Sequence, residues 1–494
     1  MAGVASALKH PAERRRLRHD FRQVPAAAGS GMVPGFVIQG IPMRLLSLAC
    51  ALALGLSSVA ASAATPAAKV QGSEAIVSKT LANGLKIIVW PDHDIPNANY
   101  YTFYKVGSRN EYPGITGLAH YFEHMMFNGT TRRAPGEFDR TMEAAGGSNN
   151  ASTSNDLTIY TDWFPSSALE TIFDLEGDRM ANLSFDPKVI ESERGVVYSE
   201  RRSSVDNDNF GTLLEQLQAT AFTAHPYQFP TIGWPSDIEH WTIDDLKAFF
   251  KTYYAPNNAV LVITGDVDPQ QVFALADRYL AAIPRQPTPP AVTTVEPEQL
   301  GERRIVVERA DVRAPILAYA FHTGFGAAGK DAPALELLTT ILSDGDSSRL
   351  HQRLVEREQV AVDVGAFADL GFDPGLLWIY ANLPPGADVA KAQGLLDDEL
   401  ARIVRDGVSA AELDKARNLQ LSAFWRQMAT INGKARALGD HEVFNGDYRL
   451  AFDAPARYAA VSAADIQALA AKLLRQRNRT TGILLPTTEH AEAA

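Results

Sequence analysis

Two histidines and a glutamate within one helical turn form the part of this chain best suited to chemistry. His120, Glu123 and His124 lie in residues 114–130, whose apolar side chains recur every three to four positions and so predict a helix. On a helix the two histidines project from the same side, and Glu123 lies on the flank of that side. Two neutral imidazoles with a carboxylate that need not be a ligand make the first half of a catalytic zinc site. The plainer alternative is a helix that carries two ordinary histidines.

A third ligand is needed to complete such a site. A zinc peptidase uses three protein ligands and one open position for water, and here the third ligand should be a carboxylate on another element. Residues 191–200 supply candidates, because Glu193 and Glu200 are seven residues apart and share one face of a predicted helix. The alternative is that these are exposed carboxylates paired with the neighbouring arginines.

The composition is that of a globular chain with room for two to four domains. The chain has 494 residues and a net charge of −12, and this acidic balance argues against a nucleic-acid partner. After the N-terminal segment no stretch is apolar enough to span a bilayer. The single cysteine, Cys50, lies in that segment, so any metal in the mature chain must be held by histidines and carboxylates.

The first 63 residues predict an N-terminal extension that ends in a secretory signal peptide. Residues 43–63 combine a short basic start, an apolar run and a small-x-small cleavage site, so we expect cleavage near 63/64 and export to the periplasm. Residues 1–42 precede this signal awkwardly and are explained by an upstream start codon that is not used. A mitochondrial presequence is the second interpretation, since residues 1–42 are rich in arginine, but the apolar run and cleavage site fit it badly.

The mature chain is predicted to contain two copies of one α+β unit. Paired strands over residues 84–107 precede the histidine helix, and the same strand, strand and helix pattern returns over residues 304–343, roughly 217–219 residues later. Only the first copy carries a histidine pair. A proline-rich segment between them predicts an extended, exposed connector. The expected division is therefore a catalytic domain over 64–282, a linker over 283–303 and an inactive domain over 304–488.

Further elements are expected between these landmarks. They are a helix ending at 143–147, two strands over 150–164, helices over 166–181, 187–203 and 236–254, and a buried strand over 259–265.

Taken together, these features resemble the M16 family of zinc metallopeptidases, which includes pitrilysin, insulin-degrading enzyme and the mitochondrial processing peptidase. The resemblance covers nearly all of the mature chain, and its anchors are residues 117–125, 150–153, 193–200 and 254–266. It points to the bacterial, exported type with two such domains. It implies an α+β fold in which two homologous M16-type domains, each a mainly antiparallel sheet packed with helices, form half of a clamshell.

The resemblance also implies the roles of the candidate residues. His120, His124 and Glu200 would hold one Zn²⁺ per chain, because the family's third ligand lies about 76 residues past the second histidine. Glu123 would take a proton from water and pass it to the leaving amine. Glu193 matches the family's carboxylate that orients a ligating histidine.

A substrate strand and an activity follow from the same resemblance. The segment that matches the family's edge strand, onto which a peptide adds as an extra β-strand, is Asn150, Ala151, Ser152 and Thr153. The implied activity is zinc-dependent hydrolysis of short or unfolded peptides. The alternatives are a subunit of a mitochondrial-type presequence processing peptidase and a non-catalytic binding or scaffold subunit.

The chain departs from the family in its second half. Active members carry an arginine and a tyrosine, seven residues apart, that help to hold the substrate; here Val355 and Val362 occupy those positions and offer no side-chain hydrogen bond. Arg353 and Arg357 would point elsewhere on a helix. Single-chain members close four units around a chamber, whereas this chain has two, so we expect a dimer. We expect a heterodimer with an M16 homologue that supplies the arginine and tyrosine, and a homodimer is the second choice.

Overall fold

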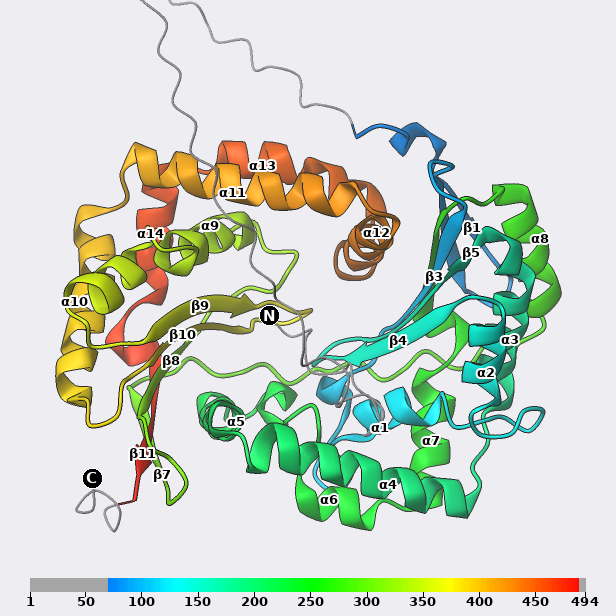
Figure 1. Ribbon diagram of the computed structural model, residues 1–494, viewed down its shortest axis with the longest axis horizontal. Coiled ribbons are helices and arrows are strands. Elements are labelled where there is room, and N and C mark those ends of the chain that lie inside the picture. The colour runs from blue at the N-terminus through cyan, green and yellow to red at the C-terminus, as the bar shows by residue number, and fades with distance from the viewer. Residues whose placement is uncertain (1–69, 488–494) are drawn as a thin grey trace, which may run out of the picture. The chain divides into compact units, whose positions relative to one another are not determined.

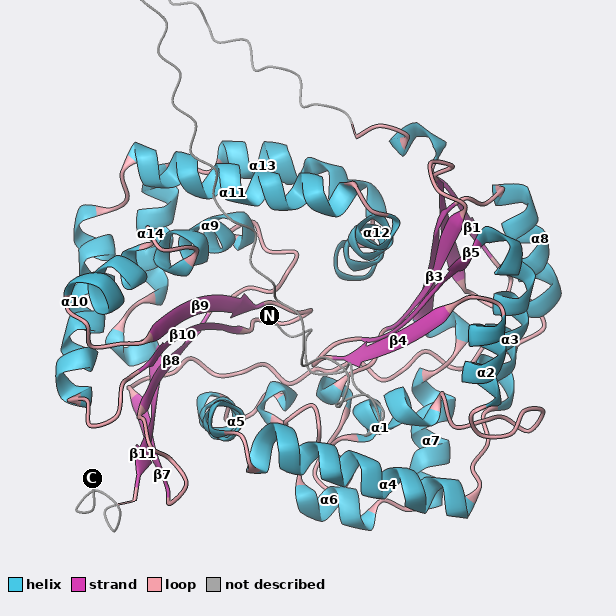
Figure 2. Ribbon diagram, viewed as in Figure 1, coloured by secondary structure: helices cyan, strands magenta, loops and turns pink. Residues whose placement is uncertain are grey.

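The computed structural model describes residues 70–487, in which two β-sheets are packed with helices (Figures 1 and 2). The predicted extension, signal peptide and cleavage site lie outside these described residues. Within residues 70–487 no helix has both the length and the apolar character needed to cross a bilayer. The predicted architecture of two sheets packed with helices is confirmed.

The first sheet has six strands in the order β1-β2-β6-β3-β5-β4, and only the β2–β6 pair is parallel. The strands are β1 (Val77–Thr80), β2 (Lys86–Pro91), β3 (Asn97–Tyr104), β4 (Ser148–Thr153), β5 (Thr158–Pro165) and β6 (Ala259–Gly265). β6 is buried along its whole length, as its continuous apolar run predicts. β4 ends the strand order, so its outer edge pairs with no strand of the described chain.

The strands predicted over residues 84–107 form, but the prediction that they pair with each other is wrong. β6 lies between β2 and β3, parallel to β2 and antiparallel to β3. Two strands joined by a short polar turn look locally like a hairpin. Only packing of the whole domain places a strand from much later in the chain between them.

The second sheet repeats the pairing of the first. Its five strands have the order β7-β11-β8-β10-β9, again with one parallel pair, β7–β11. They are β7 (Arg303–Arg309), β8 (Ile316–His322), β9 (Asp363–Asp369), β10 (Leu376–Asn382) and β11 (Arg479–Pro486). β7, β11, β8, β10 and β9 correspond in order to β2, β6, β3, β5 and β4. The predicted duplication of one α+β unit is therefore confirmed at the level of topology.

Fourteen α-helices surround the sheets in the described residues. They are α1 (Leu118–Met125), α2 (Glu137–Ala144), α3 (Leu169–Asn182), α4 (Pro187–Arg201), α5 (Asn209–Ala221), α6 (Pro235–His240), α7 (Ile243–Tyr253), α8 (Pro269–Tyr279), α9 (Ala332–Ser343), α10 (Val389–Asp406), α11 (Ala410–Met428), α12 (Ile431–Asn445), α13 (Ala454–Ala460) and α14 (Ala463–Leu473). The single helix predicted over 236–254 is in fact two. Thr242 and Asp245 form a capping box that starts α7 and so separates it from α6.

Each half of the chain contributes helices to the sheet of the other half. Leu438 of α12 and Phe424 of α11 belong to the apolar cluster on one face of the first sheet, together with Ile88. In return, Leu213 and Leu217 of α5 pack on the second sheet. Figure 1 shows α12 beside the first sheet and α5 beside the second. Because packing crosses the linker in both directions, the boundary predicted at 283–303 stays a prediction.

The linker lacks regular structure, as expected, but it is not simply an exposed spacer. The Glu296 carboxylate accepts hydrogen bonds from the backbone N–H groups of residues 223–225, just after α5. The buried Gln299 donates through Nε2 to the carbonyl oxygen of Arg479 on β11. The later part of the linker is therefore fixed to both halves, whereas the proline-rich segment 283–290 is irregular and largely exposed, as predicted.

Candidate metal centre

The helix that carries the histidine pair starts at a turn that only glycine fits. Gly117 precedes α1 with a φ of 89°, and a Cβ there would lie 2.6 Å from the carbonyl oxygen of Ile232. The buried carboxylate of Glu111 accepts hydrogen bonds from the N–H groups of Gly117 and Ala119, both at 2.7 Å. These bonds satisfy amides that the first helical turn leaves unpaired. Burial nevertheless raises the pKa of Glu111 well above its usual range.

Three buried tyrosine hydroxyls then fix α1 against its neighbours. Tyr121 of α1 donates to the carbonyl oxygen of Ile190 on α4 at 2.8 Å. Tyr160 of β5 donates to the carbonyl oxygen of Phe122 at 2.8 Å, and Tyr254 donates to that of Ala119 at 3.2 Å. These three hydrogen bonds anchor α1 to α4, to β5 and to the segment just after α7, and so make it a rigid platform for the two histidines.

His120, His124 and Glu200 converge. One possible ligand atom from each of the three lies within 4.8 Å of the others, and no other group of this kind occurs among residues 70–487. Glu200 Oε2 is 3.7 Å from His120 Nε2 and 3.2 Å from His124 Nε2. Two imidazole nitrogens and one carboxylate oxygen match a catalytic zinc set that keeps a position open for water. The residues present therefore fit a zinc ion.

The electrostatics of the two histidines differ. Burial lowers the pKa of His120, which favours the neutral imidazole that a metal ligand requires. Burial also lowers the pKa of His124, but the hydrogen bonds that its ring donates to the Glu193 and Glu200 carboxylates outweigh burial and raise the pKa to about 9. The pair of carboxylates around His124 thus makes a site that favours a positive charge.

Glu193 reaches His124 from behind the cluster. Its Oε1 lies 2.8 Å from His124 Nδ1, while Glu200 faces Nε2 of the same ring. The shared face of α4 predicted for the two glutamates therefore points at α1. Arg201 contributes to holding α4 in place, because its guanidinium bonds the Glu215 carboxylate and the carbonyl oxygen of Gly233.

Glu123 extends from α1 toward the edge strand. Its Oε2 accepts a hydrogen bond from Thr153 Oγ1, the last residue of β4, at 2.7 Å. Asn150 and Ser152 of β4 are exposed on one face of the strand, and Ala151 and Thr153 lie on the other face. The four residues predicted to bind substrate thus occupy an edge strand whose end touches the predicted base.

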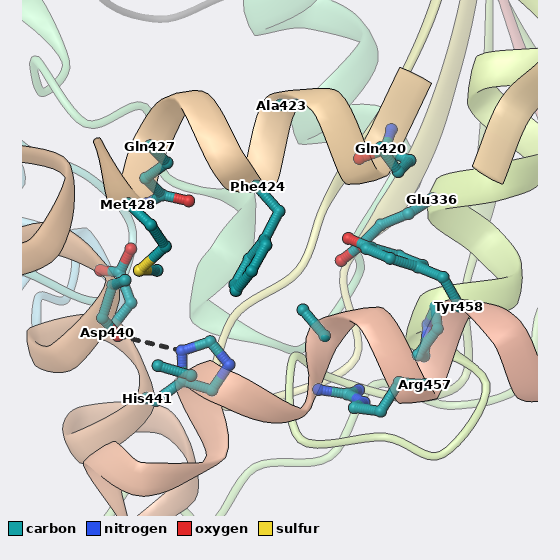
Figure 3. Close-up of a pocket in the computed structure, with 14 residues that line it drawn as sticks. Glu336, Gln420, Ala423, Phe424, Gln427, Met428, Asp440, His441, Arg457 and Tyr458 are labelled. Atoms are coloured by element: carbon teal, nitrogen blue, oxygen red, sulfur yellow. Dashed lines mark hydrogen bonds between the residues drawn. The ribbon is translucent and has the colours of Figure 1, made fainter. Parts of the chain in front are cut away.

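Up to residue 487, the second half holds no counterpart of this cluster. α9 occupies the place of α1, and its Glu336 accepts a hydrogen bond from Tyr458 at 2.5 Å. Figure 3 shows these side chains in a pocket formed by α9, α11, α12 and α13, with Asp440 and His441 on its opposite side. At the positions of the family's arginine and tyrosine, Val355 is partly buried against the second core and Val362 is 66% exposed.

Several residues that shape the site were missed in the sequence. Glu111, Thr153 as a partner of Glu123, and the three tyrosines act through contacts between separate elements. The one signal that could have indicated Glu111 is an acidic residue shortly before a glycine-rich helix start, where negative charge is favourable. Arg109 was also missed: it pairs with Asp156 of the β4–β5 turn and with Asp373 of the second half.

Comparison with known proteins gives two family models and a set of relatives. The description "Insulinase (Peptidase family M16)" matches residues 92–233, and "Peptidase M16 inactive domain" matches residues 240–420. The zinc protease PqqE of Helicobacter pylori is 30% identical over 412 residues, which are 83% of this chain and 92% of that protein.

Solved structures agree with these matches. A protease from Helicobacter pylori aligns with a TM-score of 0.80 at 30% identity, covering 83% of this chain and 99% of that one. The periplasmic protease PqqL of Escherichia coli has the same fold, with a TM-score of 0.70 at 20% identity. That alignment covers 86% of this chain but only 49% of PqqL.

Proposed function

This chain belongs to the M16 family of peptidases, and we propose from that premise that it is a zinc-dependent endopeptidase that hydrolyses short or unfolded peptides. The proposal rests on one observation: His120, His124 and Glu200 lie close together, next to β4, an edge strand whose outer side pairs with no other strand of the described chain. The zinc proteases among the relatives support the same reaction class.

In this proposal each side chain has a separate task. His120, His124 and Glu200 would hold Zn²⁺, which would act as a Lewis acid and bring the pKa of water toward neutrality. Glu123 accepts a proton from this water and returns it to the amine nitrogen as the peptide bond breaks. Glu193 fixes the orientation of the His124 ring by accepting from its Nδ1–H.

The substrate lies along β4 as an added strand. Backbone pairing to an edge strand accepts extended peptides of many sequences and excludes folded proteins. Asn150 and Ser152 are exposed on this strand. We therefore expect weak sequence preference.

We further propose that the chain works as one half of a dimer. Its two repeated units match only about half of PqqL, so a second protein with the same fold would supply the other half of a chamber. Val355 and Val362 cannot bind a peptide carbonyl through their side chains, which favours an M16 partner that supplies an arginine and a tyrosine. If purified chain alone cleaves peptides at full rate, the heterodimer is refuted and the homodimer remains.

The cellular location belongs to the same proposal. The signal-like segment at residues 43–63 favours export to the periplasm. Mature protein recovered from the periplasmic fraction should begin at Ala64. An N-terminus at Met1 in the cytoplasmic fraction would contradict export.

A quenched peptide provides the direct test. Cleavage by the assembled enzyme should stop with a chelator and return with Zn²⁺. Glu123→Gln should abolish hydrolysis and keep one zinc per chain, because this side chain is assigned to proton transfer rather than to the metal. Loss of zinc in that variant would show that a ligand has been mistaken for the base. Absence of cleavage with zinc and every M16 partner would instead indicate a scaffold subunit.

A further inference from the structure

The hydroxyl of Thr153 joins the proposed substrate strand to the proposed base. Among the described residues, Thr153 is the one whose side chain hydrogen-bonds the Glu123 carboxylate, with Oγ1 2.7 Å from Oε2. Thr153 is the last residue of β4, and Glu123 lies in the last turn of α1. The base and the strand are therefore connected directly rather than through other elements.

The side chain of Thr153 faces the helix and not the open face of the strand. Side chains alternate along β4, so Asn149, Ala151 and Thr153 share one face; Asn149 donates to Asp139 on α2 and Ala151 is buried. Ser152, on the other face, is exposed. Because it points toward the helix, the Thr153 hydroxyl is poorly placed to contact a substrate side chain.

Glu123 needs such a partner because its own side chain is long and partly exposed. The neighbouring His124 is held by Glu193, and the α1 backbone is held by Glu111 and the tyrosines. None of these bonds restricts the side-chain torsions of Glu123. A hydroxyl that donates to a carboxylate forms a strong hydrogen bond, and this bond favours one rotamer of the glutamate side chain.

We propose that Thr153 is a positioning residue for the base, an inference that rests on the proposed peptidase function. By binding Oε2, its hydroxyl leaves Oε1 to accept the proton of water, and it holds the base at a fixed distance from the strand on which the peptide lies. The peptide bond and the base are then fixed relative to each other, because the strand that positions Glu123 also positions an extended peptide paired with β4.

Thr153→Val tests this role, because valine keeps the shape and the strand preference of threonine and removes the hydroxyl. In the assembly that gives wild-type activity, we expect kcat on a quenched peptide to fall roughly 10- to 100-fold, with KM and zinc content unchanged. Thr153→Ser retains the hydroxyl and should keep kcat within about threefold of wild type.

The matched control is Thr161→Val in β5. Its hydroxyl donates to the carbonyl oxygen of Asn150 at 3.1 Å, so this change removes a hydrogen bond onto β4 without touching Glu123. We expect its kcat to stay within about threefold of wild type. An equal loss in both valine variants would show that Thr153 only stabilises the strand, and would overturn the inference.

Other outcomes also decide the question. Wild-type kcat in Thr153→Val, or a serine variant as slow as the valine one, overturns the positioning role while leaving the peptidase assignment intact. If Thr153→Val fails to fold, the comparison moves to Thr153→Ser against Thr153→Ala, which differ by the hydroxyl; equal kcat values would refute the role. A wild-type protein that is loaded with zinc and cleaves nothing refutes the proposed function and this inference together.

Discussion

Removing the carboxylate of Glu193 should weaken zinc binding without touching a ligand. Its Oε1 lies 2.8 Å from His124 Nδ1, and the side chains are only 15% and 18% exposed. A hydrogen bond to a charged group in such a setting contributes about 1.5–3 kcal/mol. At about 1.4 kcal/mol for each factor of ten, this corresponds to roughly 10- to 100-fold in the zinc dissociation constant.

Two substitutions separate charge from shape. Glu193→Gln keeps an acceptor oxygen for the His124 N–H and loses the charge, so we expect the lower end of that range, about tenfold. Glu193→Ala leaves a partly buried N–H without this acceptor, so we expect the upper end, about 100-fold. Glu191→Gln is the matched control, because Glu191 lies on the same helix with a side chain 75% exposed.

The assay is competition between the protein and a chromogenic chelator for zinc, followed by kcat at saturating zinc. Each Glu193 variant should regain much of its kcat once zinc is in excess, since the ligands and Glu123 are intact. Zinc affinities within twofold of wild type for both Glu193 variants would refute the reasoning, as would an equal loss in Glu191→Gln.

Three further predictions concern stability. Gly117→Ala should lower the free energy of unfolding by more than about 2 kcal/mol in a denaturant titration, because alanine is strained at a φ of 89° and its Cβ would lie 2.6 Å from a backbone oxygen. The control, Gly195→Ala on the open side of α4, should be neutral or stabilising. Equal values for the two variants would contradict this reasoning. Tyr160→Phe should cost about 1–2 kcal/mol by removing the hydrogen bond to the carbonyl oxygen of Phe122, and an unchanged unfolding midpoint would show that bond to be worthless. Burial raises the pKa of Asp156 to about 6, so the folded state holds this proton more tightly than the unfolded state, and the group's contribution to stability falls as pH rises from about 4 to about 6. The free energy of unfolding of Asp156→Asn should therefore lack up to about 3 kcal/mol of this decrease. Parallel curves of unfolding free energy against pH for the two proteins would refute the prediction.

Local patterns were enough for most elements. The spacing of apolar residues placed α1, and the continuous apolar run placed β6 as a buried strand. The internal offset revealed the duplication that the two strand orders confirm. These signals survive because helix and strand periodicity depend on neighbours within a few residues.

Pairing between distant segments could not be derived in the same way. The sequence of β2 and β3 predicts a hairpin, but β6 lies between the two strands in the sheet. Likewise, α5 and α12 cover sheets that belong to the opposite half of the chain. The energy that decides such choices comes from apolar surface buried between elements far apart in sequence, which no short window contains.

The same distinction between local pattern and long-range packing applies to the residues of the site. The spacing of His120, Glu123 and His124 is enough to predict that both histidines share one side of a helix with the glutamate beside them, because a turn of helix fixes that geometry locally. The roles of Glu200 and Glu193 could be inferred only from the family resemblance. Their distances to the imidazole rings, and the hydrogen bond from Thr153 to Glu123, are set by the folded chain. Those distances depend on how α4 and β4 pack against α1, and packing of separate elements is a property of the folded core rather than of any one segment.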